Sequence, residues 1–130
     1  MKLRSLRRDQ QGASALEFAL AAPAMLMFII GIAQLGIMFF ANAGLSSAVA
    51  EGARYATIYP RPSNSQIQAF VNASRFGLEP TRMSTPTVTS GTADGVNYVE
   101  ITASYSVPLD FIFFTLPPVT LTETRRAFVQ

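Results

Sequence analysis

The longest apolar run of the chain lies near its N-terminus. Residues 18–50 carry no charge, and the segment 18–40 holds eleven Leu, Ile or Phe side chains. A helix needs about 20 apolar residues to cross the hydrocarbon core of a bilayer. The pattern therefore predicts one membrane-spanning helix, which with its outward extension should cover residues 13–58. The alternative is a buried helix of a soluble protein, but a chain of 130 residues has too little other surface to cover it.

Several features of this helix concern packing. Pro23 removes one backbone hydrogen bond and should kink the helix modestly. Further along, small residues recur at every fourth position, so they share one helix face and let another element approach closely. These residues are Gly44, Ala48, Gly52 and Ala56. Their partner is either a helix of another subunit or the chain's own C-terminal domain. Glu51 and Arg54 lie on the same extension and can form a structural ion pair.

The pattern changes near residue 59, and residues 59–130 are expected to form a small α+β domain. A Pro-Arg-Pro triplet at 60–62 should end the long helix. A second helix is expected at about 65–76, with an N-cap among residues 63–65 and Gly77 just beyond its end. Its apolar face should cover a sheet.

Strand signals begin with a short candidate at 87–89, followed by a turn-rich loop at 91–95. Apolar and polar residues then alternate over 99–107, which is the clearest strand pattern in the chain, and Pro108 should close it.

The segment 109–116 is very apolar, and it is either a short helix in the core or a patch lying on the membrane surface. Pro117 and Pro118 should break it, and 119–129 is expected to be the final strand. The predicted fold class is thus α+β: one long N-terminal transmembrane helix, then a short helix packed on an antiparallel sheet of about three strands.

Charge predicts the orientation of the chain in the membrane. Four cationic residues, Lys2, Arg4, Arg7 and Arg8, precede the apolar run, whereas a mixed Glu51/Arg54 pair follows it. The positive-inside rule then puts the N-terminus in the cytoplasm and residues from about 45 onward outside it. From residue 13 onward there are six scattered Arg and seven acids, so no basic face for nucleic acid is expected.

The composition leaves little for catalysis. The chain has no Cys and no His, and its only Lys is Lys2, which excludes disulfides, zinc fingers, Cys nucleophiles and the usual general base. There is no Gly-rich phosphate loop, metal-ligand cluster or nucleophile elbow in the sequence. We therefore expect no enzyme activity, no catalytic residues, no metal and no cofactor.

The residues just before the apolar run suggest processing. A basic leader, residues 1–12, ends in Gly12, and four uncharged residues separate it from Glu17. This arrangement resembles a type IV prepilin site. The resemblance implies cleavage by a prepilin peptidase between Gly12 and Ala13, with Glu17 as the fifth mature residue and the partner of a neighbouring subunit's N-terminal amine.

Two other interpretations of this region stay open. Glu17 can simply occupy the first helical turn, favoured by the helix dipole and by lipid headgroups. The small residues Ala48-Val49-Ala50 resemble a signal-peptidase site, although the apolar run before them is longer than the roughly 7–15 residues of a signal core.

The resemblance becomes more specific over residues 12–58. The segment GASALEFALAAPAMLMFIIGIAQLG, with AVAEGARYAT after it, resembles the TadE-like family of minor pilins or pseudopilins in tight-adherence (Flp-type) pilus systems. The matching positions are Glu17, Phe18, Ala19, Leu20, Pro23, Glu51, Gly52, Ala53, Arg54, Tyr55 and Ala56, with Ala50 where the family often has Arg.

This resemblance implies a minor subunit that assembles at the inner membrane, with its C-terminal domain periplasmic. Its implied partners are prepilin peptidase, other pilins or pseudopilins, inner-membrane platform proteins and membrane lipid. The alternative is an unprocessed single-pass subunit of an envelope complex that binds a partner through its outer domain.

Overall fold

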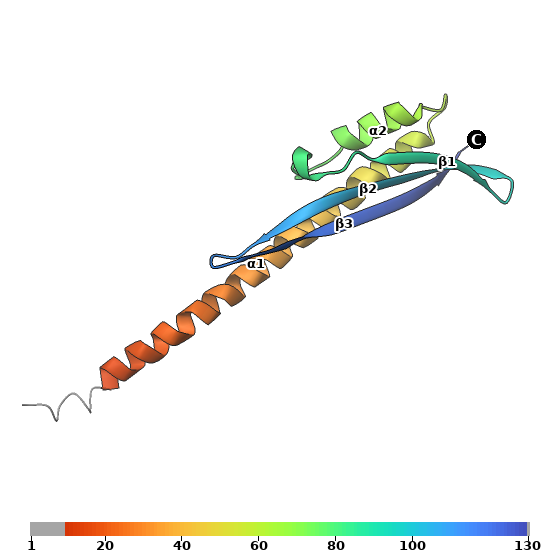
Figure 1. Ribbon diagram of the computed structural model, residues 1–130. Coiled ribbons are helices and arrows are strands. Elements are labelled where there is room, and N and C mark those ends of the chain that lie inside the picture. Colours follow the sequence, from red (N-terminus) through yellow and green to blue (C-terminus); the bar gives the residue numbers. More distant parts are fainter. Residues whose placement is uncertain (1–9, 130) are drawn as a thin grey trace, which may run out of the picture.

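The computed structural model describes residues 10–129, with side chains from residue 12 onward. The cationic residues of the predicted leader, at positions 2–8, lie outside the described part of the chain. Helix α1 (Gln10–Ala56) has 47 residues and therefore extends for about 70 Å. Its first half projects alone from the rest of the molecule, and its second half lies along a small domain (Figure 1).

The domain follows α1 in the order α2 (Asn64–Ala73), η2 (Pro80–Arg82), β1 (Thr87–Ala93), β2 (Val96–Asp110) and β3 (Thr115–Phe128). The strands form one antiparallel sheet in the order β1-β2-β3. The predicted α+β class is confirmed: one long apolar helix is followed by a short helix and a three-stranded antiparallel sheet.

The core lies between α1, α2 and one face of the sheet. Every second residue of β2 from Val99 to Val107 is buried, as the alternating pattern predicts. These side chains pack with Leu45 and Val49 of α1 and with Ile67 and Val71 of α2, all fully buried. The opposite face of the sheet carries polar side chains. The sheet is therefore covered by helices on one face only.

Helix α2 begins with a capping box. The Ser63 hydroxyl accepts from the backbone N–H of Gln66, and the Gln66 side chain accepts from the backbone N–H of Ser63. This exchange satisfies two backbone donors that a helix start would otherwise leave free. The helix ends at Ala73, three residues earlier than expected, and Gly77 beyond it has a φ of 68°.

Two predictions about the sheet were wrong in detail. Pro108 does not close β2, and Pro117 and Pro118 do not break the last strand, because both strands run through these positions. The ladder between β2 and β3 is interrupted between Val107 and Leu109, opposite the two prolines, and β3 is an edge strand. Proline lacks the N–H that a regular ladder requires, and it is tolerated there because the interrupted ladder and the strand edge do not need that N–H.

The ends of the hairpins also differ from expectation. The predicted loop at 91–95 is shorter, because β1 continues to Ala93 and the turn itself consists of Asp94 and Gly95, both with positive φ. The apolar segment 109–116 forms no helix. Its ends belong to β2 and β3, and residues 111–114 form the loop that joins them.

Candidate functional site

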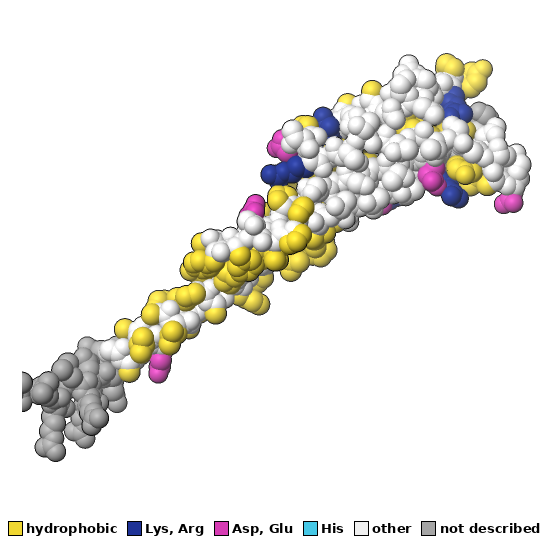
Figure 2. Space-filling model, viewed as in Figure 1, with side chains coloured by type: hydrophobic (Ala, Val, Ile, Leu, Met, Phe, Trp, Pro, Cys, Tyr) yellow, Lys and Arg dark blue, Asp and Glu magenta, His cyan; other side chains and the backbone are white. Residues whose placement is uncertain are grey.

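The first half of α1 is an exposed apolar surface. Most of its large side chains are about half to three-quarters exposed, and only 6% of its most apolar 18-residue window is buried. Figure 2 shows apolar side chains around this helix where it leaves the domain. A core helix of a soluble protein would have these side chains covered. The helix instead fits a single-pass membrane protein, as its length and composition predict.

The predicted processing residues lie in the first turns of this helix. Gly12, Ala13 and Glu17 are all exposed, and α1 already begins at Gln10. Glu17 forms no ion pair or side-chain hydrogen bond with the rest of the chain from residue 12 to 129. Pro23 lies one to two turns further on, and α1 continues through it without a break. The expected kink at Pro23 stays a prediction.

The small-residue face of α1 packs against the chain's own domain. Gly44, Ala48, Gly52 and Ala56 are all buried. A Cβ atom added to Gly44 would lie 2.6 Å from the carbonyl oxygen of Phe76, and one added to Gly52 would overlap Cγ2 of Val71 in α2. Of the two partners considered for this face, the structure places the C-terminal domain there. The face leaves no room for a helix of another subunit.

The predicted pair of Glu51 and Arg54 is present on the outer side of α1. An Nη2 atom of Arg54 lies 3.0 Å from Oε2 of Glu51, and the arginine side chain is 79% exposed. An exposed pair of this kind contributes little to stability. Its two charges make this end of α1 polar.

A second cluster of charged side chains lies on the open face of the sheet, and the sequence pattern does not predict it. Arg126 of β3 donates to the carboxylate of Glu100 of β2, and its guanidinium lies 4.8 Å from the centre of the Tyr98 ring. The hydrogen bond to Glu100 raises the pKa of Arg126 above its ordinary value. Cross-strand pairing at Glu100 and Arg126 brings these groups together, so the cluster stabilises the hairpin.

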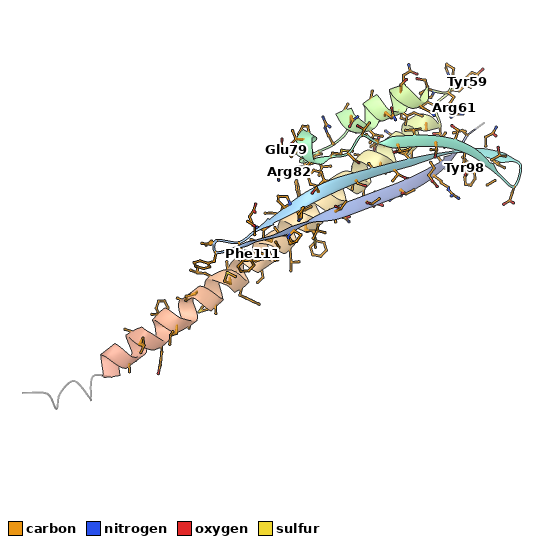
Figure 3. All side chains as sticks on the ribbon, viewed as in Figure 1. Tyr59, Arg61, Glu79, Arg82, Tyr98 and Phe111 are labelled. Carbon is orange, nitrogen blue, oxygen red and sulfur yellow. The ribbon has the colours of Figure 1, made fainter. Side chains whose placement is uncertain are left out.

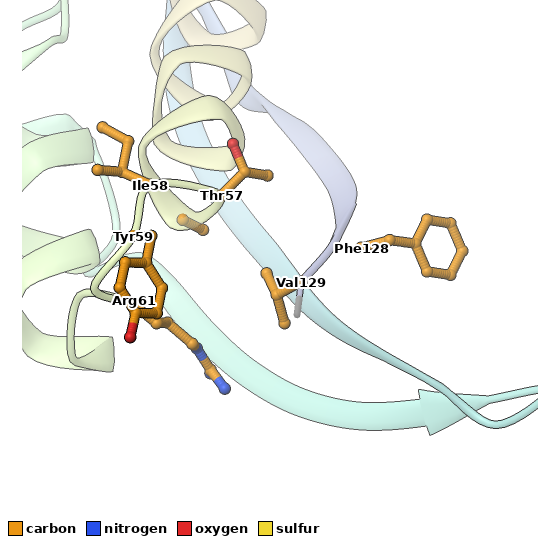
Figure 4. Close-up of a pocket in the computed structure, with 7 residues that line it drawn as sticks. Thr57, Ile58, Tyr59, Arg61, Phe128 and Val129 are labelled. Carbon is orange, nitrogen blue, oxygen red and sulfur yellow. The ribbon is translucent and has the colours of Figure 1, made fainter.

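A hollow of about 360 Å³ lies where α1 ends beside the end of β3. Figure 4 shows Tyr59, Arg61 and Val129 around it. Arg61 donates to the hydroxyl of Ser90, and the lining contains no carboxylate. Over the described residues there is also no group of three acids that could hold a metal ion.

Among the long-range contacts that sequence reasoning missed, one lies in the apolar run itself. Nε2 of Gln34, the one strongly polar side chain in the apolar run, donates to the carbonyl oxygen of Asp110, 2.7 Å away. This bond joins the exposed part of α1 to the end of β2, next to the loop between β2 and β3. Only the three-dimensional fold brings two residues 76 positions apart together.

The comparisons with known proteins agree with this description for the N-terminal part of the chain. Residues 12–54 match the model of the family described as TadE-like protein. The resemblance drawn from the sequence is confirmed over these residues, which include most of α1 but no part of the sheet. Comparisons with curated proteins and with solved structures find no match.

Proposed function

We propose that this chain, whose residues 12–54 match the TadE-like family, is a minor pilin or pseudopilin of a tight-adherence pilus assembly and secretion system. The family is a structural, pilus-associated one, so the chain acts by assembly and not by catalysis. The observation that carries the proposal is the first half of α1: an exposed apolar helix that has Gly12 and Glu17 in its first turns and lies, from Gly12 onward, within the matched segment.

The proposed topology puts the N-terminus in the cytoplasm and the domain in the periplasm, with α1 in the inner membrane. The cationic leader at positions 2–8 supports this direction, because positive residues are retained on the cytoplasmic side. The predominantly polar outer face of the sheet suits the aqueous compartment on the other side.

Processing is the first step of the proposed mechanism. Prepilin peptidase cuts between Gly12 and Ala13, and the freed amine of Ala13 becomes a positive charge at the membrane edge. Glu17 lies in the next helical turn, exposed and without an ion pair among residues 12–129. A carboxylate at the edge of the hydrocarbon is costly unless it finds a partner. The Ala13 amine of a neighbouring subunit supplies that partner.

Assembly then uses the exposed half of α1. The small-residue face is occupied by the chain's own domain, so it cannot hold a neighbouring subunit's helix. The apolar surface from Phe18 to Phe40 stays open on most sides. Lipid covers it in the membrane, and the helices of other pilins or pseudopilins replace lipid during assembly on the inner-membrane platform.

Copurification of the full chain from detergent with the other pilus proteins tests this proposal. We expect the wild-type chain and Glu51→Gln, which breaks only an exposed surface pair, to retain pilus partners. Glu17→Ala should be cut normally and should lose these partners, because it removes the proposed contact without changing the bond that is cleaved. Equal recovery of pilus partners by Glu17→Ala and wild type would contradict the role of Glu17.

The alternative function is an unprocessed single-pass subunit of an envelope complex that binds through its outer domain. In that case the chain keeps its leader, and Glu17→Ala has no effect on its partners.

A further inference from the structure

The loop between β2 and β3 exposes a cluster of large apolar side chains. We call residues 111–114 the hairpin tip. Within it, Ile112 is 67% exposed, Phe113 is 66% exposed and Phe114 is 45% exposed, and the rings of Phe111 and Phe114 stack with their centres 5.0 Å apart. The tip contains no charged residue. Such a cluster is costly in water and indicates a surface that something covers.

The hairpin tip lies beside the membrane-spanning part of α1. The hydrogen bond from Gln34 to the carbonyl oxygen of Asp110 fixes the base of the tip against the helix. In Figures 1 and 3 the β2–β3 loop, which Figure 3 labels at Phe111, points along α1 toward the half of the helix that projects from the domain. The tip is thus the part of the domain that reaches furthest toward the projecting helix.

The depth of the hairpin tip in a bilayer follows from the length of the uncharged part of α1. The uncharged run from Phe18 to Gln34 covers about 25 Å at 1.5 Å per residue. The hydrocarbon core is about 30 Å thick, so its outer boundary falls a few residues beyond Gln34, near Ile37. The base of the hairpin tip, held at Gln34, therefore lies just inside the outer edge of the hydrocarbon.

Two backbone groups at the hairpin tip and its base are hydrogen-bonded within the protein. The N–H of Phe111 donates to the carbonyl oxygen of Phe114 at 2.9 Å, and the carbonyl of Asp110 accepts from Gln34. Irregular backbone at membrane depth is tolerated only when its polar groups have partners inside the protein. The same contact also gives Gln34, a polar residue in an apolar helix, a partner of its own.

We propose that the hairpin tip inserts into the outer interfacial layer of the bilayer and forms a second membrane contact beside α1. Its occupant is lipid: the apolar surface of the tip adjoins the apolar surface of the spanning helix at the same level. The exposed carboxylate of Asp110 lies at the base of the tip, at the level of Gln34 and just inside the outer edge of the hydrocarbon, so it has to reach outward to the headgroups and limits the depth of insertion. Two contacts on one domain restrict its tilt about α1. This proposal goes beyond pilus assembly and depends only on the membrane span.

Because the chain contains no Trp, a single introduced Trp reports on the hairpin tip alone. The full chain carrying Phe113→Trp is reconstituted into vesicles of phosphatidylcholine and phosphatidylglycerol with bromine atoms in the upper half of the acyl chains. Phe28→Trp, on the exposed apolar part of α1, is the control within the membrane. Tyr59→Trp replaces a side chain that is 93% exposed at the far end of α1, and it is the control in water.

We expect Phe113→Trp to show blue-shifted emission and bromine quenching close to that of Phe28→Trp and several-fold stronger than that of Tyr59→Trp. Quenching of Phe113→Trp as weak as that of Tyr59→Trp, with Phe28→Trp strongly quenched, would overturn the proposal and leave the tip to water or to another protein. Weak quenching of all three variants would overturn it together with the membrane span. Loss of pilus partners in the copurification experiment leaves this measurement unaffected, so the two proposals fail separately.

Discussion

The substitution Gly52→Leu distinguishes between the two partners considered for the small-residue face of α1, the chain's own domain and a helix of another subunit. In the structure, a Cβ atom at position 52 overlaps Cγ2 of Val71 and lies 3.5 Å from Cδ1 of Ile101. Val71 and Ile101 are both fully buried, so neither has space to move aside. A leucine adds three further carbon atoms to this contact and should force α1 and α2 apart.

The magnitude follows from two opposing effects. Overpacking a closed core costs about 1–3 kcal/mol, and the upper end applies here because the contact is between fully buried groups. Replacing a helical glycine returns roughly 0.8–1 kcal/mol of helix propensity. The net destabilisation of about 2 kcal/mol should lower the Tm of a domain of this size by roughly 8–16 °C.

Thermal unfolding of the full chain in detergent, followed by circular dichroism, measures this shift. Ala43→Leu is the matched control, because it adds a leucine on an exposed position of the same helix and should change Tm little. An unchanged Tm for Gly52→Leu together with loss of copurifying pilus proteins would refute the reasoning. It would mean that the small-residue face meets another subunit and not the chain's own domain.

The remaining predictions concern topology, capping and cleavage. A periplasm-active reporter should be active when fused after Gln130 and inactive when fused after Gly12, and the reverse activities would invert the proposed orientation. Ser63→Ala removes the capping box with Gln66 and should cost about 1 kcal/mol, seen as a Tm lower by roughly 4–8 °C; an unchanged Tm would show that α2 is held by tertiary packing alone. Gly12→Leu should block cleavage of the leader on gel mobility, because it places a bulky side chain at the bond to be cut, whereas normal cleavage of this variant would exclude that bond.

Much of the fold could be predicted because its signals are local. The charge-free run of 18–50 predicts α1, and the alternation over 99–107 predicts the central strand with its buried side correctly assigned. The Ser63 cap and the Asp94-Gly95 turn are likewise decided by neighbouring residues. Local rules were sufficient where a single residue or short period determines the backbone.

The rest depended on contacts between distant segments. Pro117 and Pro118 look like a strand end in isolation, but they lie in an edge strand, opposite an interruption in the ladder that only the pairing of β2 with β3 creates. The spacing of Gly44 and Gly52 indicates a close approach without saying to what, and Val71 of α2 supplies the answer.

The same reason applies to the proposed sites. Nothing in the sequence near Gln34 points to Asp110, so the hairpin tip could be noticed as apolar but not placed beside the helix. The processing residues Gly12 and Glu17 were identified from the resemblance, and their roles depend on a peptidase and on neighbouring subunits, which lie outside a single chain.

The mass of the chain extracted from the membranes of cells with an active prepilin peptidase tests the central claim most directly. A pilin-like subunit predicts a mature chain that begins at Ala13 and keeps all of the exposed apolar half of α1. An intact chain from Met1 would contradict processing and favour the unprocessed envelope subunit. A chain that begins at Glu51 would contradict the whole account, because signal peptidase would then have removed the helix on which it rests.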